Sequence, residues 1–231
     1  MVLFKDIYKK AINLFDDPDI QKAYVFDTVR WEKLMYPHLI SGLAMFNSPT
    51  KISSLLVDQV DPIGKIETFD GNGSNTYFLG STPVENCDFC FMIQGKIDKG
   101  AVYNTQTNSV VFSKNVETGA ECSAEWYFCG GFNTDFKSAA TSNISSNVIL
   151  SRVKEILARA LVLEWAEKEK NFALDIRNIL TDTDFKLYSP ANSVKAKVEW
   201  VKQLKYDFDS MINKLSWDLL SRKYHGGNFY G

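Results

Sequence analysis

Four cysteines are the residues whose chemistry would be most specific. Cys87-x-x-Cys90 has the spacing of a zinc or redox pair, and Cys122 and Cys129 follow later in the chain. The first pair lies in a strand-like run, and residues three apart on a strand face opposite sides of a sheet. The second pair has six intervening residues, far from the spacing of a zinc site. We therefore expect buried free thiols and no metal.

Other catalytic constellations are weak. Of the two histidines, His38 lies within an apolar helical pattern, and His225 has no carboxylate fixed nearby in the sequence. Asp182 and Asp184 could form a carboxylate pair, but in a connection between helices such residues more often cap and turn the chain. No nucleophile motif accompanies either histidine. We expect no enzymatic activity and no cofactor.

The segment 70–74, Asp-Gly-Asn-Gly-Ser, superficially matches two ligand-binding motifs. Its acidic and polar positions fit the start of an EF-hand loop, but the twelfth position is Ser81 and the flanking segments predict strands. Its glycines lack the third glycine and the following helix of a dinucleotide-binding motif. The segment therefore predicts a hairpin turn.

Composition and charge exclude several classes of protein. The 231 residues are 45% hydrophobic and 23% charged, which is typical of a globular protein. The net charge of −2 argues against a nucleic-acid-binding protein. Charges interrupt the N-terminal apolar residues, so no signal peptide is expected. No stretch approaches roughly 18 uninterrupted apolar residues, so we expect no contact with a membrane.

Helical periodicity governs the first part of the chain. A helix is predicted over residues 4–15, and Asp17 and Pro18 are suited to start a second as its N-cap and first residue. A third helix is expected from Asp27 or Thr28 to residue 46, with a kink or break at Pro37. A short helical turn could follow within residues 50–60.

The hydrophobic period then changes to two. Six short strands at roughly ten-residue spacing predict a small antiparallel sandwich or barrel. They are expected at 65–69, 75–79, 87–97, 101–103, 109–113 and 121–129. A loop rich in Ser, Thr and Asn follows at 134–147. Two long helices are predicted after it, from about 144 to 180 and from about 193 to 222.

The order of helices, strands and helices indicates an insertion. We predict an α+β protein in which residues 1–62 and 134–222 form a helical bundle with long C-terminal helices. Residues 63–133 would form the inserted small antiparallel β-sandwich or barrel.

Residues 223–231 form an extended C-terminal tail rich in glycine and aromatic residues. Such a tail is either a disordered end or a segment that orders on a partner by aromatic anchoring or strand addition. Its candidate partner-binding residues are Tyr224, His225, Phe229 and Tyr230.

Residues 66–127 carry a pattern that resembles modules of tailed-phage virion proteins. Its pieces are Thr-Phe-Asp-Gly-Asn-Gly at 68–73, Tyr-Phe-Leu at 77–79, Thr-Pro at 82–83, Phe-Met-Ile-Gln-Gly at 91–95, Val-Tyr at 102–103, Val-Val-Phe at 110–112, Gly119 and Trp-Tyr at 126–127. The turn departs from the Gly-Asp-Gly form of those modules. The helical segments at 4–18, 156–159 and 175–179 resemble neck proteins of the head–tail connector, or adaptor, type.

The resemblance implies a structural protein of the virion neck, made in the host cytoplasm. Such adaptors form homo-oligomeric rings, commonly of twelve copies, beneath the portal protein. They extend the DNA channel and carry the tail or a second neck ring, while DNA passes without specific binding. Their C-terminal segments often reach into the portal, and residues 223–231 are the equivalent by position.

The residues themselves suit this function. A near-neutral chain suits a channel wall that must not hold DNA, and a ring needs two different complementary faces on each subunit. Two alternatives stay open. The first is a tail-completion or baseplate protein, because the β pattern is also found in those proteins. The second is a carbohydrate-binding β module on a helical stalk, in which Tyr77, Tyr103 and Trp126 would stack on sugars.

Overall fold

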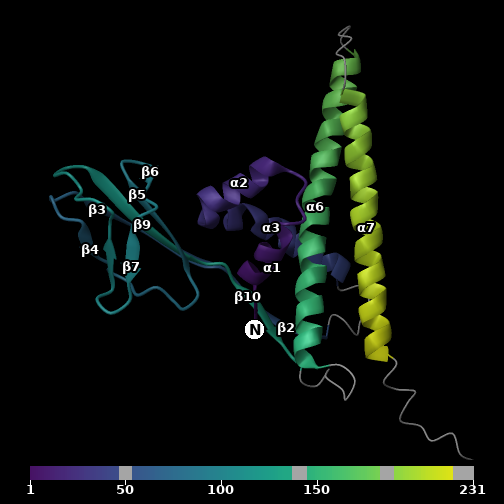
Figure 1. Cartoon of the computed structure of the whole chain (residues 1–231), viewed down its shortest axis with the longest axis horizontal. Coiled ribbons are helices and arrows are strands. Elements are labelled where there is room, and N and C mark those ends of the chain that lie inside the picture. Colours follow the sequence, from purple (N-terminus) through teal and green to yellow (C-terminus); the bar gives the residue numbers. More distant parts are fainter. Residues whose placement is uncertain (47–53, 137–144, 183–189, 221–231) are drawn as a thin grey trace, which may run out of the picture.

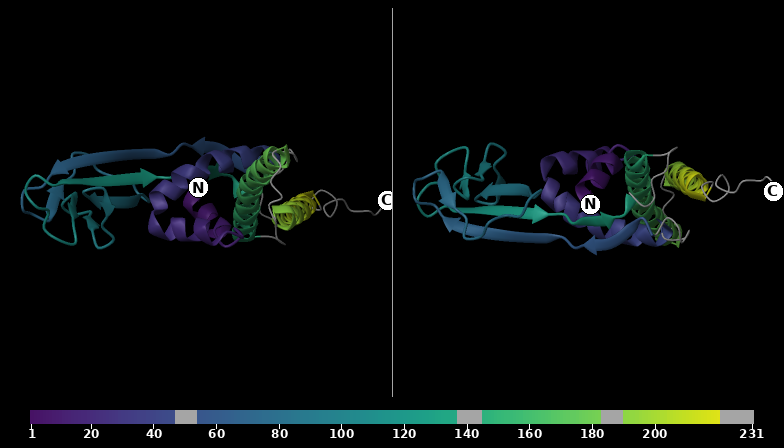
Figure 2. Two further views of the ribbon diagram at one scale, coloured as in Figure 1. Left: turned by 90° about the horizontal axis from the view of Figure 1, so that it is seen from above. Right: turned by 90° about the horizontal axis from the view of Figure 1, so that it is seen from below.

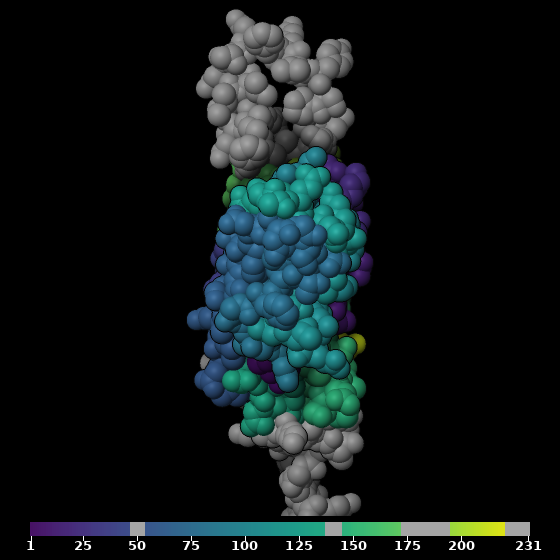
Figure 3. Space-filling model, turned by 90° about the vertical axis from the view of Figure 1, so that its left-hand side faces the viewer, coloured from purple at the N-terminus to yellow at the C-terminus, as the bar shows by residue number. Residues whose placement is uncertain are grey.

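The computed structural model of the chain describes residues 1–46, 54–136, 145–182 and 190–220. In these ranges the chain forms five helices and ten strands, and the strands pair into three small antiparallel sheets. The helices gather at one end of an elongated molecule, and the strands of two sheets form the other end (Figure 1). Figure 3 views the molecule from the sheet end, where residues coloured blue to teal make up most of the surface.

The helices pack around one central element. The helices are α1 (Phe4–Ala11), α2 (Pro18–Phe26), α3 (Thr28–Phe46), α6 (Ser146–Asp182) and α7 (Pro190–Leu220). α6 contacts α1 and α3 on one side, and α7 runs antiparallel to it along the other side (Figures 1 and 2). Apolar residues of α6 at helical spacing, such as Ile149, Val153 and Ile156, are fully buried in these contacts.

The start of α2 follows the sequence signals. The Asp17 carboxylate accepts a hydrogen bond from the Asp19 amide at 2.9 Å, and Pro18 is the first helical residue. At the start of α3, the Asp27 carboxylate accepts a hydrogen bond from the Arg30 amide at 3.0 Å. Both caps are confirmed. α3 continues through Pro37, so the break considered there does not occur.

All three sheets pair their strands antiparallel. The first orders β1 (Val2–Leu3), β10 (Gly131–Thr134) and β2 (Leu56–Val60); the second orders β3 (Ile63–Asp70), β9 (Glu121–Phe128), β5 (Asp88–Ile93) and β6 (Lys96–Ile97); the third orders β4 (Thr76–Phe78), β8 (Ser109–Val111) and β7 (Val102–Asn104). β9 pairs with β3 on one side and β5 on the other, and only its first residue is exposed. The buried residues include the polar Ser123 and Glu125 beside the apolar ones.

The first sheet lies against the helices and is not expected from the sequence. Val2 pairs with Phe132, and Gly131 pairs with Val60. The chain passes from β9 to β10 at Gly130, whose φ is +87°, and a Cβ atom there would lie 2.5 Å from the Val60 carbonyl oxygen. Only glycine fits this position. β2 pairs with β10, so its residues form a strand and not the helical turn considered from the sequence.

The predicted fold class is wrong in its specific form. The chain is α+β in general, but its strands form three small sheets and not one inserted sandwich or barrel. The described helices also form no long C-terminal bundle, because α7 packs on α6 while the opposite side of α6 is covered by α1 and α3. The turn at 70–74 is not a hairpin, because β3 pairs with β9 and β4 pairs with β8.

Two hydrophobic clusters stabilise the fold. The larger one joins α1, α3, α6, α7 and β10, with Phe4, Tyr8 and Leu157 fully buried. The smaller one contains residues of the second and third sheets and of the segments beside them, around Val110 and Phe112. Nothing tests the predicted boundaries between a helical domain and an inserted β domain, so they stay a prediction.

The crossing of α3 and α6 depends on Gly42. A Cβ atom at this position would lie 3.0 Å from the backbone carbonyl carbon of Ala160. We expect Gly42→Val to lower the free energy of unfolding by about 1–3 kcal/mol, because the two helices must move apart. The exposed neighbour Ser41 is the control, and Ser41→Val should change stability by less than about 0.5 kcal/mol. Urea denaturation measures both, and equal effects would contradict the close crossing.

Candidate functional site

The four cysteines do not come together as a reactive or metal-binding group. All are free; Cys90, Cys122 and Cys129 are buried, and Cys87 is half-buried. Burial raises the pKa of every one of these thiols, to about 11 for Cys90 and about 12 for Cys129. Buried thiols with raised pKa values are poor nucleophiles at neutral pH. The expectation of buried free thiols is confirmed for these three.

The other predicted site residues are also dispersed. His38 is half-buried on α3, its Nδ1 atom has no hydrogen-bond partner, and burial lowers its pKa. Asp182 is the last residue of α6, and Asp184 lies outside the described residues. Tyr224, His225, Phe229 and Tyr230 also lie outside the described residues. No group of three or more metal-ligating side chains occurs in the part of the chain that the structure describes.

The aromatic residues considered for sugar stacking are largely in the core. Tyr77 and Trp126 are buried in the smaller hydrophobic cluster, with 7% and 6% of their surfaces exposed. Tyr103 is half-buried and stacks on Phe89, with ring centroids 4.8 Å apart. A sugar cannot reach the faces of the first two rings, so the structure removes the support for a carbohydrate site on these residues.

A buried acid, Glu32, is the most perturbed carboxyl group. It lies on α3 and is fully buried, and neither carboxyl oxygen has a hydrogen-bond partner among the described residues. Burial, followed by the charge of Asp88, raises its pKa to about 8, although two nearby lysines act in the opposite direction. The Tyr8 hydroxyl is buried and without a partner as well.

This acid could hold a proton at neutral pH, as a general acid does. However, its carboxyl is sealed from solvent, so no solute can reach it in this structure. Glu32 therefore affects stability and not substrate chemistry. A helical-wheel inspection could have found it, because Glu32 lies three and seven residues before the buried Met35 and Leu39.

An open apolar groove lies between α2, the first half of α3 and the β5–β6 edge of the second sheet. We call it the α2–β6 groove; it has a volume of about 590 Å³, and its walls include Phe26, Trp31, Leu34, Met92 and Ile97. Phe26 and Leu34 are 61% and 60% exposed. Exposed apolar residues that line one hollow, with charged residues at its edge, are typical of interaction sites.

A second apolar surface lies on α7. The side chains that α7 buries are Val201, Leu204, Phe208, Ile212 and Leu215. Tyr206 and Trp217 are 70% and 71% exposed on the opposite side of the helix. They are eleven residues apart, which is about three turns and about 16 Å, so they share one outward face. We call these two residues the aromatic stripe.

The groove and the stripe lie on opposite sides of α6. α2 and the second sheet are on one side of this helix, and α7 is on the other (Figures 1 and 2). Sequence reasoning missed both surfaces. The groove joins segments distant in sequence, whereas the eleven-residue spacing of the stripe could have been noticed. The two surfaces differ in shape and composition, which is the condition for head-to-tail association.

Comparison of the sequence with models of known protein families and with curated proteins gives no match. Among the described residues, no helix combines the length and the hydrophobicity needed to cross a membrane.

Proposed function

We propose that this chain is a structural subunit of a ring in the neck of a tailed phage, where it joins the portal to the tail. The observation that carries the proposal is the pair of unlike apolar surfaces on opposite sides of α6, the α2–β6 groove and the aromatic stripe. In a ring, each subunit presents one surface to the preceding copy and a different one to the next.

Exposed aromatic residues favour this role for α7. Tyrosine and tryptophan are enriched at protein interfaces, because they bury much apolar area at a small cost in conformational entropy. Tyr206 and Trp217 each expose about seven-tenths of their surfaces. We propose that the aromatic stripe of one copy packs into the α2–β6 groove of the next. The net charge of −2 suits passage of DNA without retention.

Labelling of assembled particles tests the location directly. A small tag at the N-terminus of the chain, detected by gold-conjugated antibody in electron micrographs, is expected at the junction between head and tail. The untagged phage is the control for background label. Label at the tail tip would contradict the neck assignment and favour a tail-completion or baseplate protein.

The C-terminal tail carries a separate prediction. Deletion of residues 223–231 should leave the free energy of unfolding unchanged within about 0.5 kcal/mol, because a glycine-rich chain end contributes little to a core. The same deletion should weaken binding to the portal ring in co-sedimentation. A shortened chain that unfolds would show that the tail belongs to the core and would overturn this prediction.

A further inference from the structure

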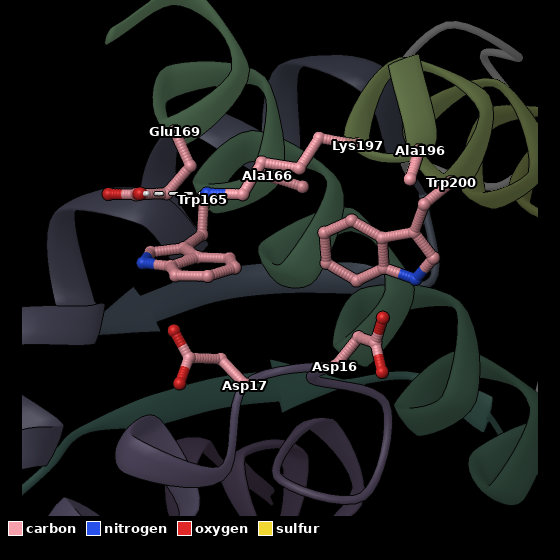
Figure 4. Close-up of a pocket in the computed structure, with 8 residues that line it drawn as sticks. All are labelled: Asp16, Asp17, Trp165, Ala166, Glu169, Ala196, Lys197 and Trp200. Atoms are coloured by element: carbon pink, nitrogen blue, oxygen red, sulfur yellow. Dashed lines mark ion pairs between the residues drawn. The ribbon is translucent and has the colours of Figure 1, made fainter. Parts of the chain in front are cut away.

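A small pocket lies where α6, α7 and the connection before α2 meet. It has a volume of about 130 Å³. Figure 4 shows Trp165 and Trp200 along one side and the carboxylates of Asp16 and Asp17 on the other, directed toward the rings. The indole centroids are 6.3 Å apart and the rings are inclined at 77°. Two helices and a loop therefore bring aromatic faces and acidic groups into one cavity.

The aromatic side of the pocket is held in place by packing. Trp165 meets Phe15 edge to face, with ring centroids 5.0 Å apart, and both tryptophans pack against the larger hydrophobic cluster. The ring of Trp165 is thus fixed between Phe15 and Trp200. A preformed aromatic wall binds a ligand without the entropy cost of ordering its side chains.

The pocket has an excess of negative charge. Glu169 and Lys197 form an ion pair at 3.8 Å across its rim (Figure 4), so their charges balance. The carboxylates of Asp16 and Asp17 remain. Asp17 caps α2 through the Asp19 amide, and Asp16 has no hydrogen bond or ion pair within the described residues. Two negative charges therefore face two indole rings.

This chemistry selects an organic cation. The face of an indole ring attracts a cation, and an adjacent carboxylate adds charge pairing and hydrogen bonding. Anions are repelled, and the rings supply no ligand atoms for a metal. A planar guanidinium group stacks on indole and donates to carboxylates at the same time, which an ammonium group does less well. A volume of about 130 Å³ admits such a head group but not a nucleotide.

We propose that this pocket binds the guanidinium group of an arginine side chain from a protein partner. The inference is independent of the proposed ring, because neither the aromatic stripe nor the α2–β6 groove contributes to the pocket. The pocket thus adds a specific polar contact to the two apolar candidate surfaces, the α2–β6 groove and the aromatic stripe.

The test uses the full chain and N-acetyl-arginine amide as the probe. The indole N–H signals are followed by two-dimensional NMR. The variants Trp165→Phe and Trp200→Phe each remove one signal and so assign the signals of the two tryptophans in the pocket. Saturable shifts of these two signals are expected. N-acetyl-citrulline amide, the neutral isostere, should bind at least about tenfold more weakly because it lacks the charge. Equal binding of citrulline, or no shift at any arginine concentration, would overturn the proposal.

A matched pair of variants isolates the acidic groups. Asp16→Asn/Asp17→Asn removes both charges, and asparagine keeps the helix cap. This variant should melt like the original chain and bind arginine at least about tenfold more weakly. Asp58→Asn/Asp209→Asn removes two exposed charges outside the pocket and should leave binding unchanged. If both variants weakened arginine binding equally, the binding would depend on the overall charge of the chain and not on this pocket, which would overturn the proposal. Equal affinity for N-acetyl-arginine amide and N-acetyl-lysine amide would overturn the assignment to guanidinium.

Discussion

Replacing Tyr206 and Trp217 together by glutamate is expected to abolish assembly of the chain while leaving each subunit folded. Both side chains project away from the face that α7 buries against α6, so the change removes no contact of the described core. Large aromatic residues at the centre of an interface each contribute about 2 kcal/mol or more. Their loss should weaken every subunit contact by roughly several hundredfold in Kd. Sedimentation velocity measures the result.

The control keeps the change in charge and moves it off the stripe. Lys205→Gln/Lys214→Gln also makes α7 more negative by two charges, at exposed positions on either side of the stripe. This variant should assemble like the original chain. Loss of assembly in both variants would mean that charge, and not aromatic contact, governs the association.

A mixing experiment separates a head-to-tail contact from a symmetric one. Phe26→Glu/Leu34→Glu disables the α2–β6 groove, whose two most exposed apolar residues it replaces. Each surface variant alone should be monomeric. An equal mixture should form heterodimers, because one intact groove and one intact stripe remain on different chains. A mixture that stays monomeric would contradict packing of the stripe into the groove.

Replacing Glu32 by glutamine should change how stability depends on pH. In the folded chain the pKa of Glu32 is raised from 4.5 to about 8. Between these two pH values the Glu32 carboxyl keeps its proton in the folded chain and loses it in the unfolded chain. The free energy of unfolding therefore falls as pH rises from about 4.5 to about 8. The slope is about 1.4 kcal/mol per pH unit, or about 5 kcal/mol in all as an upper figure. The variant should lack this fall and be the more stable chain at pH 8.

Urea denaturation at several pH values measures this effect. Glu85→Gln is the matched control, because it makes the same chemical change at an exposed position. The control should follow the pH profile of the original chain. A parallel profile for Glu32→Gln would show that the carboxyl is ionised in the folded protein and that its surroundings are more polar than the structure indicates.

The sequence predicts the elements of this fold better than their arrangement. Asp17, Pro18 and Asp27 act through local hydrogen bonds and backbone preference, so the starts of α2 and α3 could be located. The strand predicted at 121–129 forms the central strand β9 (Glu121–Phe128). Local signals of this kind do not depend on what packs against them.

The pairing of strands depends on contacts between distant residues. β1 has only two residues, Val2 and Leu3, and it is a strand because β10 lies beside it. β3 and β4 flank a sequence typical of a hairpin turn, yet each pairs with a different strand. In both cases tertiary contacts override the local pattern. The prediction of one inserted sandwich or barrel was wrong for this reason.

The candidate surfaces were even less accessible to sequence reasoning. The α2–β6 groove exists only because α2 lies beside β5 and β6. The pocket proposed to bind guanidinium exists only because α6 meets α7. Trp165, Trp200 and Asp16 are far apart in the sequence and line one cavity only in the folded chain. The resemblance to neck proteins supplies a functional expectation but identifies none of these residues.

A native mass spectrum of the purified chain over a series of concentrations tests the central claim most directly. A closed oligomer of one stoichiometry, near twelve subunits, is expected to grow at the expense of monomer, without open intermediates of increasing length. The same series is repeated in the presence of the cognate portal ring. Monomer at every concentration, both alone and with the portal, would contradict a ring-forming neck protein.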